Sequence, residues 1–102
     1  MGWAAAHIEK LAAGETVSFR PTGNSMVPKI RSKQLVTVEP VALDAIAVGD
    51  VVLCRVKGSE YLHNVLAIDS PGGRLRFQIG NNRGGINGWT AAVFGRLVKV
   101  ED

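Results

Sequence analysis

Residues 51–68 read VVLCRVKGSEYLHNVLAI, and this stretch decides the fold. The first half of this stretch alternates with the two-residue period of a β-strand. One face of that strand therefore carries Val52, Cys54 and Val56. Residues 57–60 have the Gly and Ser composition of a hairpin turn. The second half is again a strand with largely apolar faces, and His63 points to one defined side of it. The stretch therefore predicts a β-hairpin.

Short runs rich in β-branched residues flank this hairpin and are bounded by Gly, Pro or Ser. We expect strands at residues 16–20, 35–39, 74–79 and 94–100. The N-terminal segment differs, because Ala4, Ile8 and Leu11 recur at the spacing of one helix face and Gly14 follows as a stop. Residues 80–88 are rich in Gly and Asn, and we expect them to form a long loop.

The chain of 102 residues is long enough for one domain, so residues 1–102 are interpreted as a single unit. Its predicted fold is mainly β, with one short N-terminal helix at 3–13 and a coiled antiparallel β domain at 14–100. With 46% apolar residues the chain can bury a core without disulfides or metals. The one cysteine, Cys54, lies in an apolar run and is interpreted as a buried small hydrophobe. We expect neither a metal ion nor a cofactor.

Charge and N-terminal sequence bear on partners and compartment. The net charge is +3, and Lys29, Arg31 and Lys33 alternate along one segment. Nucleic-acid binders usually add interleaved aromatics or a recognition helix, so this segment is interpreted as solvated and no nucleic-acid partner is expected. Residues 1–10 lack a basic n-region, and no stretch approaches the roughly 18 apolar residues of a membrane span. These features predict a cytoplasmic protein without a membrane anchor.

The residues of greatest chemical interest are 23–28, which read GNSMVP. A serine on a turn between Gly and Pro can expose its hydroxyl, and the backbone N–H groups of Ser25 and Met26 can point at a developing oxyanion. The same residue types are ordinary turn formers, so a structural role stays open for the turn alone. His63 follows Ser25 by 38 residues, and it could act as a base at neutral pH or be a histidine without a role.

Taken in order, these features resemble the superfamily that contains LexA-type self-cleaving repressors, UmuD-like proteins and type I signal peptidases. The resemblance covers residues 14 to 100 and rests on the segments Gly23-Asn24-Ser25-Met26, Val48-Gly49-Asp50-Val51-Val52, Leu62-His63-Asn64-Val65 and Gly80-Asn81-Asn82, with Gly95 in the last strand. It implies that Ser25 attacks a peptide carbonyl and that His63 takes its proton. Bacterial signal peptidases and LexA have a lysine base, whereas the archaeal and endoplasmic-reticulum enzymes have a histidine, which His63 resembles.

Two positions depart from the family pattern. The histidine-type signal peptidases orient the base with an Asp in a Gly-Asp-Asn box, and here Asn81 stands at that place. The resemblance makes Asn81 the candidate orienting residue, but an amide does not offset an imidazolium charge, so low activity is expected. Asn64 replaces the basic residue that usually follows the base. Ala13-Gly14 is similar to a self-cleavage site, yet a helix C-cap explains Gly14.

The resemblance implies a soluble serine endopeptidase, a hydrolase that uses a Ser–His dyad on a protein or peptide substrate. The alternative is a catalytically weak or inactive module of the same fold, which binds a peptide or protein partner as UmuD-like proteins do and could form a homodimer. A truncated repressor core is less well supported because no DNA-binding helices precede the domain. Short free-standing domains of this kind resemble those encoded by phages.

Overall fold

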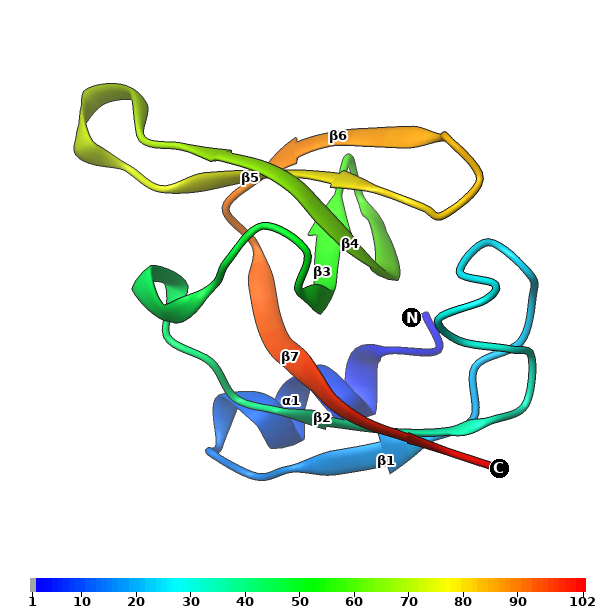
Figure 1. Cartoon of the computed structure of the whole chain (residues 1–102). Coiled ribbons are helices and arrows are strands. Elements are labelled where there is room, and N and C mark those ends of the chain that lie inside the picture. The colour runs from blue at the N-terminus through cyan, green and yellow to red at the C-terminus, as the bar shows by residue number, and fades with distance from the viewer. Residues whose placement is uncertain (1) are drawn as a thin grey trace.

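The structure, a computed structural model, describes residues 2–102, which form one α-helix and seven strands (Figure 1). The elements are α1 (Ala5–Ala12), β1 (Val17–Phe19), β2 (Leu35–Glu39), β3 (Val51–Val56), β4 (Ser59–Asp69), β5 (Arg76–Gly80), β6 (Ile86–Thr90) and β7 (Val93–Glu101). All neighbouring strands are antiparallel, and they form one sheet in the order β1-β2-β7-β3-β4-β5-β6. The predicted class, mainly β and antiparallel with one short helix, is confirmed.

The predicted hairpin is β3 and β4, and it sets the position of His63. In its register Val52 lies opposite His63, and Leu53 lies opposite Leu62. β3 is apolar along nearly its whole length because its two faces pack into two different apolar clusters. A slip of one residue would exchange these faces, so burial on both sides fixes the register and the side on which His63 lies.

The two clusters divide the core between the two halves of the sheet. The first contains Ala4, Leu11, Val17, Met26, Ile30, Val36, Val38, Val51, Leu53 and Leu62. The second contains Ile46, Val52, Cys54, Val56, Val65, Phe77, Ile79 and Val93. α1 lies against β1 and β7 and covers the first cluster (Figure 1). Cys54 is fully buried, as its apolar surroundings in the sequence predict.

The helix is shorter than the predicted range of residues 3–13. It ends where Gly14 adopts a φ of +86°, and the N–H of Glu15 donates to the Lys10 carbonyl over 2.9 Å. This arrangement is a left-handed C-terminal cap, which explains Gly14. No helix among residues 2–102 has the length and apolar character that crossing a membrane requires.

The loop predicted at residues 80–88 is wrong over its second half, where β6 begins. β6 pairs along β5, with Gln78 opposite Trp89 and Phe77 opposite Thr90. Only residues 81–85 remain as the connection between the two strands. The sequence does not reveal β6 because Asn87 and Gly88 have low strand propensity, and long-range pairing with β5 overrides that preference.

Candidate active site

Ser25 lies on the turn between β1 and β2, and the neighbours of Ser25 hold it at the surface. Gly23 has a φ of +106°, a left-handed conformation that suits glycine and bends the chain before the serine. The next side chain along, Met26, is only 5% exposed and packs into the first apolar cluster. Because Met26 anchors the turn from inside, Ser25 stays partly exposed beside it.

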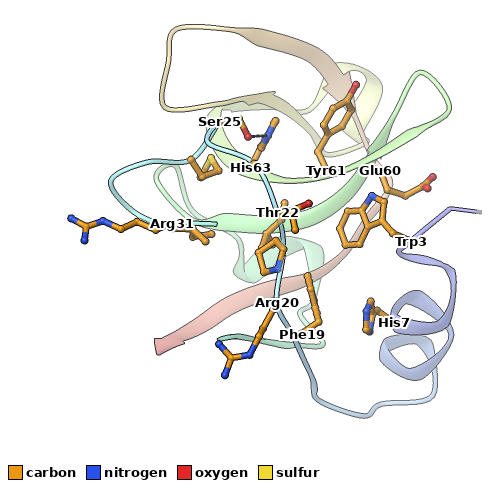
Figure 2. Close-up of a pocket in the computed structure, with 15 residues that line it drawn as sticks. Trp3, His7, Phe19, Arg20, Thr22, Ser25, Arg31, Glu60, Tyr61 and His63 are labelled. Atoms are coloured by element: carbon orange, nitrogen blue, oxygen red, sulfur yellow. Dashed lines mark hydrogen bonds between the residues drawn. The ribbon is translucent and has the colours of Figure 1, made fainter. Parts of the chain in front are cut away.

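The turn brings Ser25 to His63 on β4. Ser25 Oγ lies 3.0 Å from His63 Nε2, which is hydrogen-bond distance (Figure 2). The contact joins two residues 38 positions apart in the chain, and their proximity is what the family resemblance implies. His63 itself is 7% exposed, so its ring is enclosed on most sides.

Asn87, not Asn81, is the partner of the second ring nitrogen of His63. Asn87 lies on β6, and its Oδ1 is 2.7 Å from His63 Nδ1. The predicted orienting role of Asn81 is therefore wrong. The Asn81 side chain instead accepts the backbone N–H groups of Arg83 and Gly85 at 2.8 and 2.9 Å. Asn commonly closes a turn in this way, and here it shapes the short connection that leads into β6.

The two contacts of His63 define its tautomer and its charge. Because an amide oxygen only accepts, Nδ1 carries the proton and donates it to Asn87, and the Nε2 lone pair faces the Ser25 hydroxyl. Burial lowers the pKa of His63 below its usual 6.5, and the hydrogen bond to Asn87 offsets part of that effect. The imidazole is therefore neutral at neutral pH and able to accept a proton at Nε2.

A chain of amides ties the serine turn to the strand that carries His63. Asn64 donates through Nδ2 to Asn82 Oδ1 at 2.6 Å, and Asn82 donates through its own Nδ2 to the Met26 carbonyl at 3.1 Å. The backbone N–H of Asn82 also donates to the Ser25 carbonyl at 2.9 Å. Lys29 Nζ completes the chain by donating to Asn64 Oδ1 at 2.6 Å. The turn that carries Ser25 is thus tied through Asn82 to Asn64, the residue that follows His63 on β4.

The backbone N–H groups of Ser25 and Met26 are available at the same place. Among residues 2–102, neither group donates to a protein acceptor, and both residues line the cleft described below. The carbonyl oxygens of these residues are engaged instead, by Asn82 and Ile30. Neither N–H group is thus occupied by an acceptor among residues 2–102, and both belong to residues that line the cleft.

A cleft of about 400 Å³ opens in front of Ser25 and His63. Figure 2 shows the two side chains at one end of it, with Trp3, His7 and Phe19 near the other end. The volume lies within the range that small-ligand and peptide-side-chain sites occupy. Within residues 2–102, no group of three or more His, Cys, Asp or Glu side chains is arranged to hold a metal ion.

A hydroxyl, an imidazole and an amide oxygen thus lie in line, which is the order of nucleophile, base and orienting group. Comparison of the chain with protein-family models, with curated proteins and with solved structures found no match. The chemistry of the site therefore rests on the geometry of its own residues.

Sequence reasoning missed Asn87 and Asn82, for two different reasons. Asn87 lies on β6, which pairs with β5, the strand next to β4, and no local pattern marks that pairing. Asn82 belongs to the Gly80-Asn81-Asn82 segment that the resemblance had singled out, but its role is to hold the serine turn rather than the histidine. Asn64 stands where the family pattern has a basic residue. A cation is nevertheless present there, because Lys29, four residues after Ser25, donates to Asn64 Oδ1.

Proposed function

We propose that this protein is a serine peptidase in which Ser25 is the nucleophile and His63 is the general base. One observation carries the proposal: Ser25 Oγ is 3.0 Å from His63 Nε2, while Nδ1 of the same ring is held at 2.7 Å by Asn87. A hydroxyl becomes a useful nucleophile when an adjacent base takes its proton, and this base is oriented by a third group. The substrate is a protein or peptide.

The proposed reaction proceeds in two halves. Ser25 Oγ attacks the carbonyl carbon of the scissile bond as its proton moves to His63 Nε2, and the carbonyl oxygen becomes an oxyanion facing the N–H groups of Ser25 and Met26. The C–N bond then breaks, and the amine leaves with the proton from His63. In the second half, water gives a proton to His63 Nε2 as its oxygen attacks the acyl carbon. The bond from that carbon to Ser25 Oγ then breaks, His63 returns the proton to Ser25 Oγ, and the carboxylic acid leaves.

We also propose that the fold is of the LexA and signal-peptidase type. Three features support this assignment: a Gly-x-Ser-Met turn between the first two strands, a histidine on the second strand of the next hairpin, and an antiparallel sheet around both. These features occur along the chain in the order that the resemblance implies.

A second candidate is a catalytically weak or silent module of the same fold that binds a peptide or protein partner. The observation that favours it is the identity of Asn87, which is an amide where a triad usually has a carboxylate. An amide fixes the tautomer of His63 but leaves an imidazolium without a counter-charge. The cleft would bind its partner in either case.

Labelling with a fluorophosphonate probe separates the two candidates. The peptidase predicts a covalent adduct on Ser25, located by mass spectrometry of the digested protein, and no adduct at this position in Ser25→Ala. Ser18 and Ser70, which lie away from the cleft, provide internal controls for nonspecific reaction. An unlabelled Ser25 would favour the silent module.

A further inference from the structure

The cleft offers an apolar floor next to the proposed nucleophile. Met26, Ile30 and Leu62 line it, although each is no more than 6% exposed. These side chains are held in place by the first apolar cluster, so the floor is preformed. A floor of this kind accepts an apolar side chain without rearrangement.

Aromatic rings form the wall of the cleft away from Ser25. The Phe19 ring is stacked on the His7 ring at a centroid distance of 4.4 Å, and Trp3 lies 5.6 Å from Phe19 at a tilt of 50°. Trp3 is nevertheless 52% exposed, so a large part of its ring faces solvent at the wall of the cleft. Figure 2 shows these three side chains gathered where α1 approaches β1. A ligand that covers this exposed ring would remove a large apolar area from water, and that burial would stabilise the complex.

The charged residues of the cleft leave a positive excess. Its charged lining residues are Arg20, Arg31 and Glu60. Glu60 is already paired with Arg55 at 2.8 Å, outside the cleft lining. Arg20 donates through Nη1 to the Lys33 carbonyl, and within residues 2–102 neither cleft arginine has a carboxylate within 4.0 Å. The remaining guanidinium N–H groups can take a carboxylate from outside.

We propose that the cleft binds a peptide segment carrying an aromatic or large aliphatic side chain together with a nearby Asp or Glu. The apolar side chain lies on the floor and against Trp3 and Phe19, and the carboxylate is bound by Arg20 or Arg31. This substrate class rests on the proposed peptidase function. A single-stranded nucleic acid would also find rings and positive charge, but the aliphatic floor favours a peptide.

The first test measures cleavage. The natural protein is incubated with a mixed library of peptides, and new termini are identified by mass spectrometry. We expect cleaved peptides to be enriched in those with Phe, Trp, Leu or Met and an Asp or Glu close to the scissile bond. The best peptide is then compared with matched versions in which Glu is replaced by Gln or the large residue by Ala.

Variants of the cleft assign the preference to its residues. The double variant Arg20→Ala/Arg31→Ala should reduce the ratio of kcat/KM between the Glu and Gln peptides by roughly 10-fold, because one charge-assisted contact is lost. The two single variants show which arginine makes that contact. Trp3→Ala should instead reduce the ratio of kcat/KM between the peptide with the large apolar residue and its version with Ala at that position. Arg74→Ala, an exposed arginine outside the cleft, is the matched control and should change neither ratio.

A second measurement does not need turnover. The chain has two tryptophans, so Trp89→Phe combined with Ser25→Ala leaves Trp3 as the single fluorescent reporter in a protein that cannot cleave. Titration with the Glu peptide should change Trp3 fluorescence, and the Gln peptide should bind about 10-fold more weakly. Oligothymidylate is titrated as the alternative occupant.

The outcomes separate the two proposals. Turnover with no preference for large or acidic residues would overturn the proposed substrate class but would still support the proposed peptidase function. Selective binding by the Ser25→Ala protein, with no cleavage or labelling by the natural one, would support the substrate class and overturn the peptidase. Tighter binding of oligothymidylate than of the Glu peptide would overturn the substrate class.

Discussion

At the scale of single residues, Asn87 holds the base of the proposed dyad without offering it a counter-charge. The amide oxygen holds Nδ1–H at 2.7 Å and so presents the Nε2 lone pair to Ser25. It carries no charge, and an imidazolium formed during turnover would therefore be poorly compensated in its buried site. The predicted low activity has its physical cause at this position rather than at Asn81.

Replacing Asn87 with Asp should therefore raise turnover. A carboxylate keeps the same acceptor geometry and adds the missing negative charge, and we expect kcat/KM to rise by about 10-fold or more, since the reverse change in a serine protease costs about 10⁴. Asn81→Asp is the matched control, because its side chain accepts only backbone N–H groups of the turn. A larger gain in Asn81→Asp than in Asn87→Asp would contradict the assignment of the orienting residue.

The pH dependence of the reaction tests the state of His63. Burial lowers its pKa below 6.5, so the neutral, active form persists into mildly acidic solution, and the rate falls only as pH drops through that lowered pKa. Asn87→Asp should raise the pKa and move this fall to higher pH. The measurement is the labelling rate at Ser25 between about pH 4.5 and 9. A rate that climbs steadily toward alkaline pH would indicate a different base.

At the scale of elements, the β3–β4 hairpin could be predicted because two largely apolar runs flank a turn of Gly and Ser composition. The position of His63 follows from that register, and the exposure of Ser25 follows from the composition of its turn. The β5–β6 pairing could not be predicted, because it depends on contacts between segments and not on the pattern of residues 86–90. Asn87 was missed for the same reason.

Asn82, in the connection between β5 and β6, should stabilise the turn that carries Ser25. Asn82→Ala removes the amide that joins Asn64 to the Met26 carbonyl. Asn64 Nδ2 then keeps only its weak contact with Met26 Sδ, and the Met26 carbonyl keeps only the N–H of Ile30. We expect a loss of about 1–3 kcal/mol in the free energy of unfolding, measured by urea denaturation, and a lower labelling rate with an unchanged pH midpoint. Arg83→Ala, in the same connection, should change neither value. A full labelling rate in Asn82→Ala would show that the turn does not need this anchor.

Gly95 on β7 should tolerate substitution poorly. A Cβ at this position would lie 2.7 Å from Val38 Cγ1 and 2.8 Å from the backbone oxygen of Glu39 on the neighbouring strand. Because backbone cannot move aside easily, Gly95→Ala should lower the free energy of unfolding by about 1–3 kcal/mol. Val98→Ala on the same strand, where the side chain is 47% exposed, is the control and should cost little. Equal effects of the two changes would contradict the close packing of β7 on β2.

At the scale of the whole molecule, the site depends on parts that are distant in the chain. Ser25 comes from the turn after β1, His63 from β4 and Asn87 from β6, and α1 supplies part of the cleft wall. The two apolar clusters hold these parts in register, one beneath the serine turn and the other beneath β5. The central claim is that Ser25 and His63 act as one unit across this distance.

A double-mutant cycle on peptide hydrolysis tests that claim most directly. Turnover of the best library peptide is measured for the natural protein, Ser25→Ala, His63→Ala and the double variant, each checked for unchanged circular dichroism. Residues that act as a unit give non-additive losses, so each single change should reduce kcat/KM by about 10² to 10⁴, and the double variant should be no slower than the slower single one. Full activity in His63→Ala, or losses that multiply in the double variant, would contradict the proposed dyad.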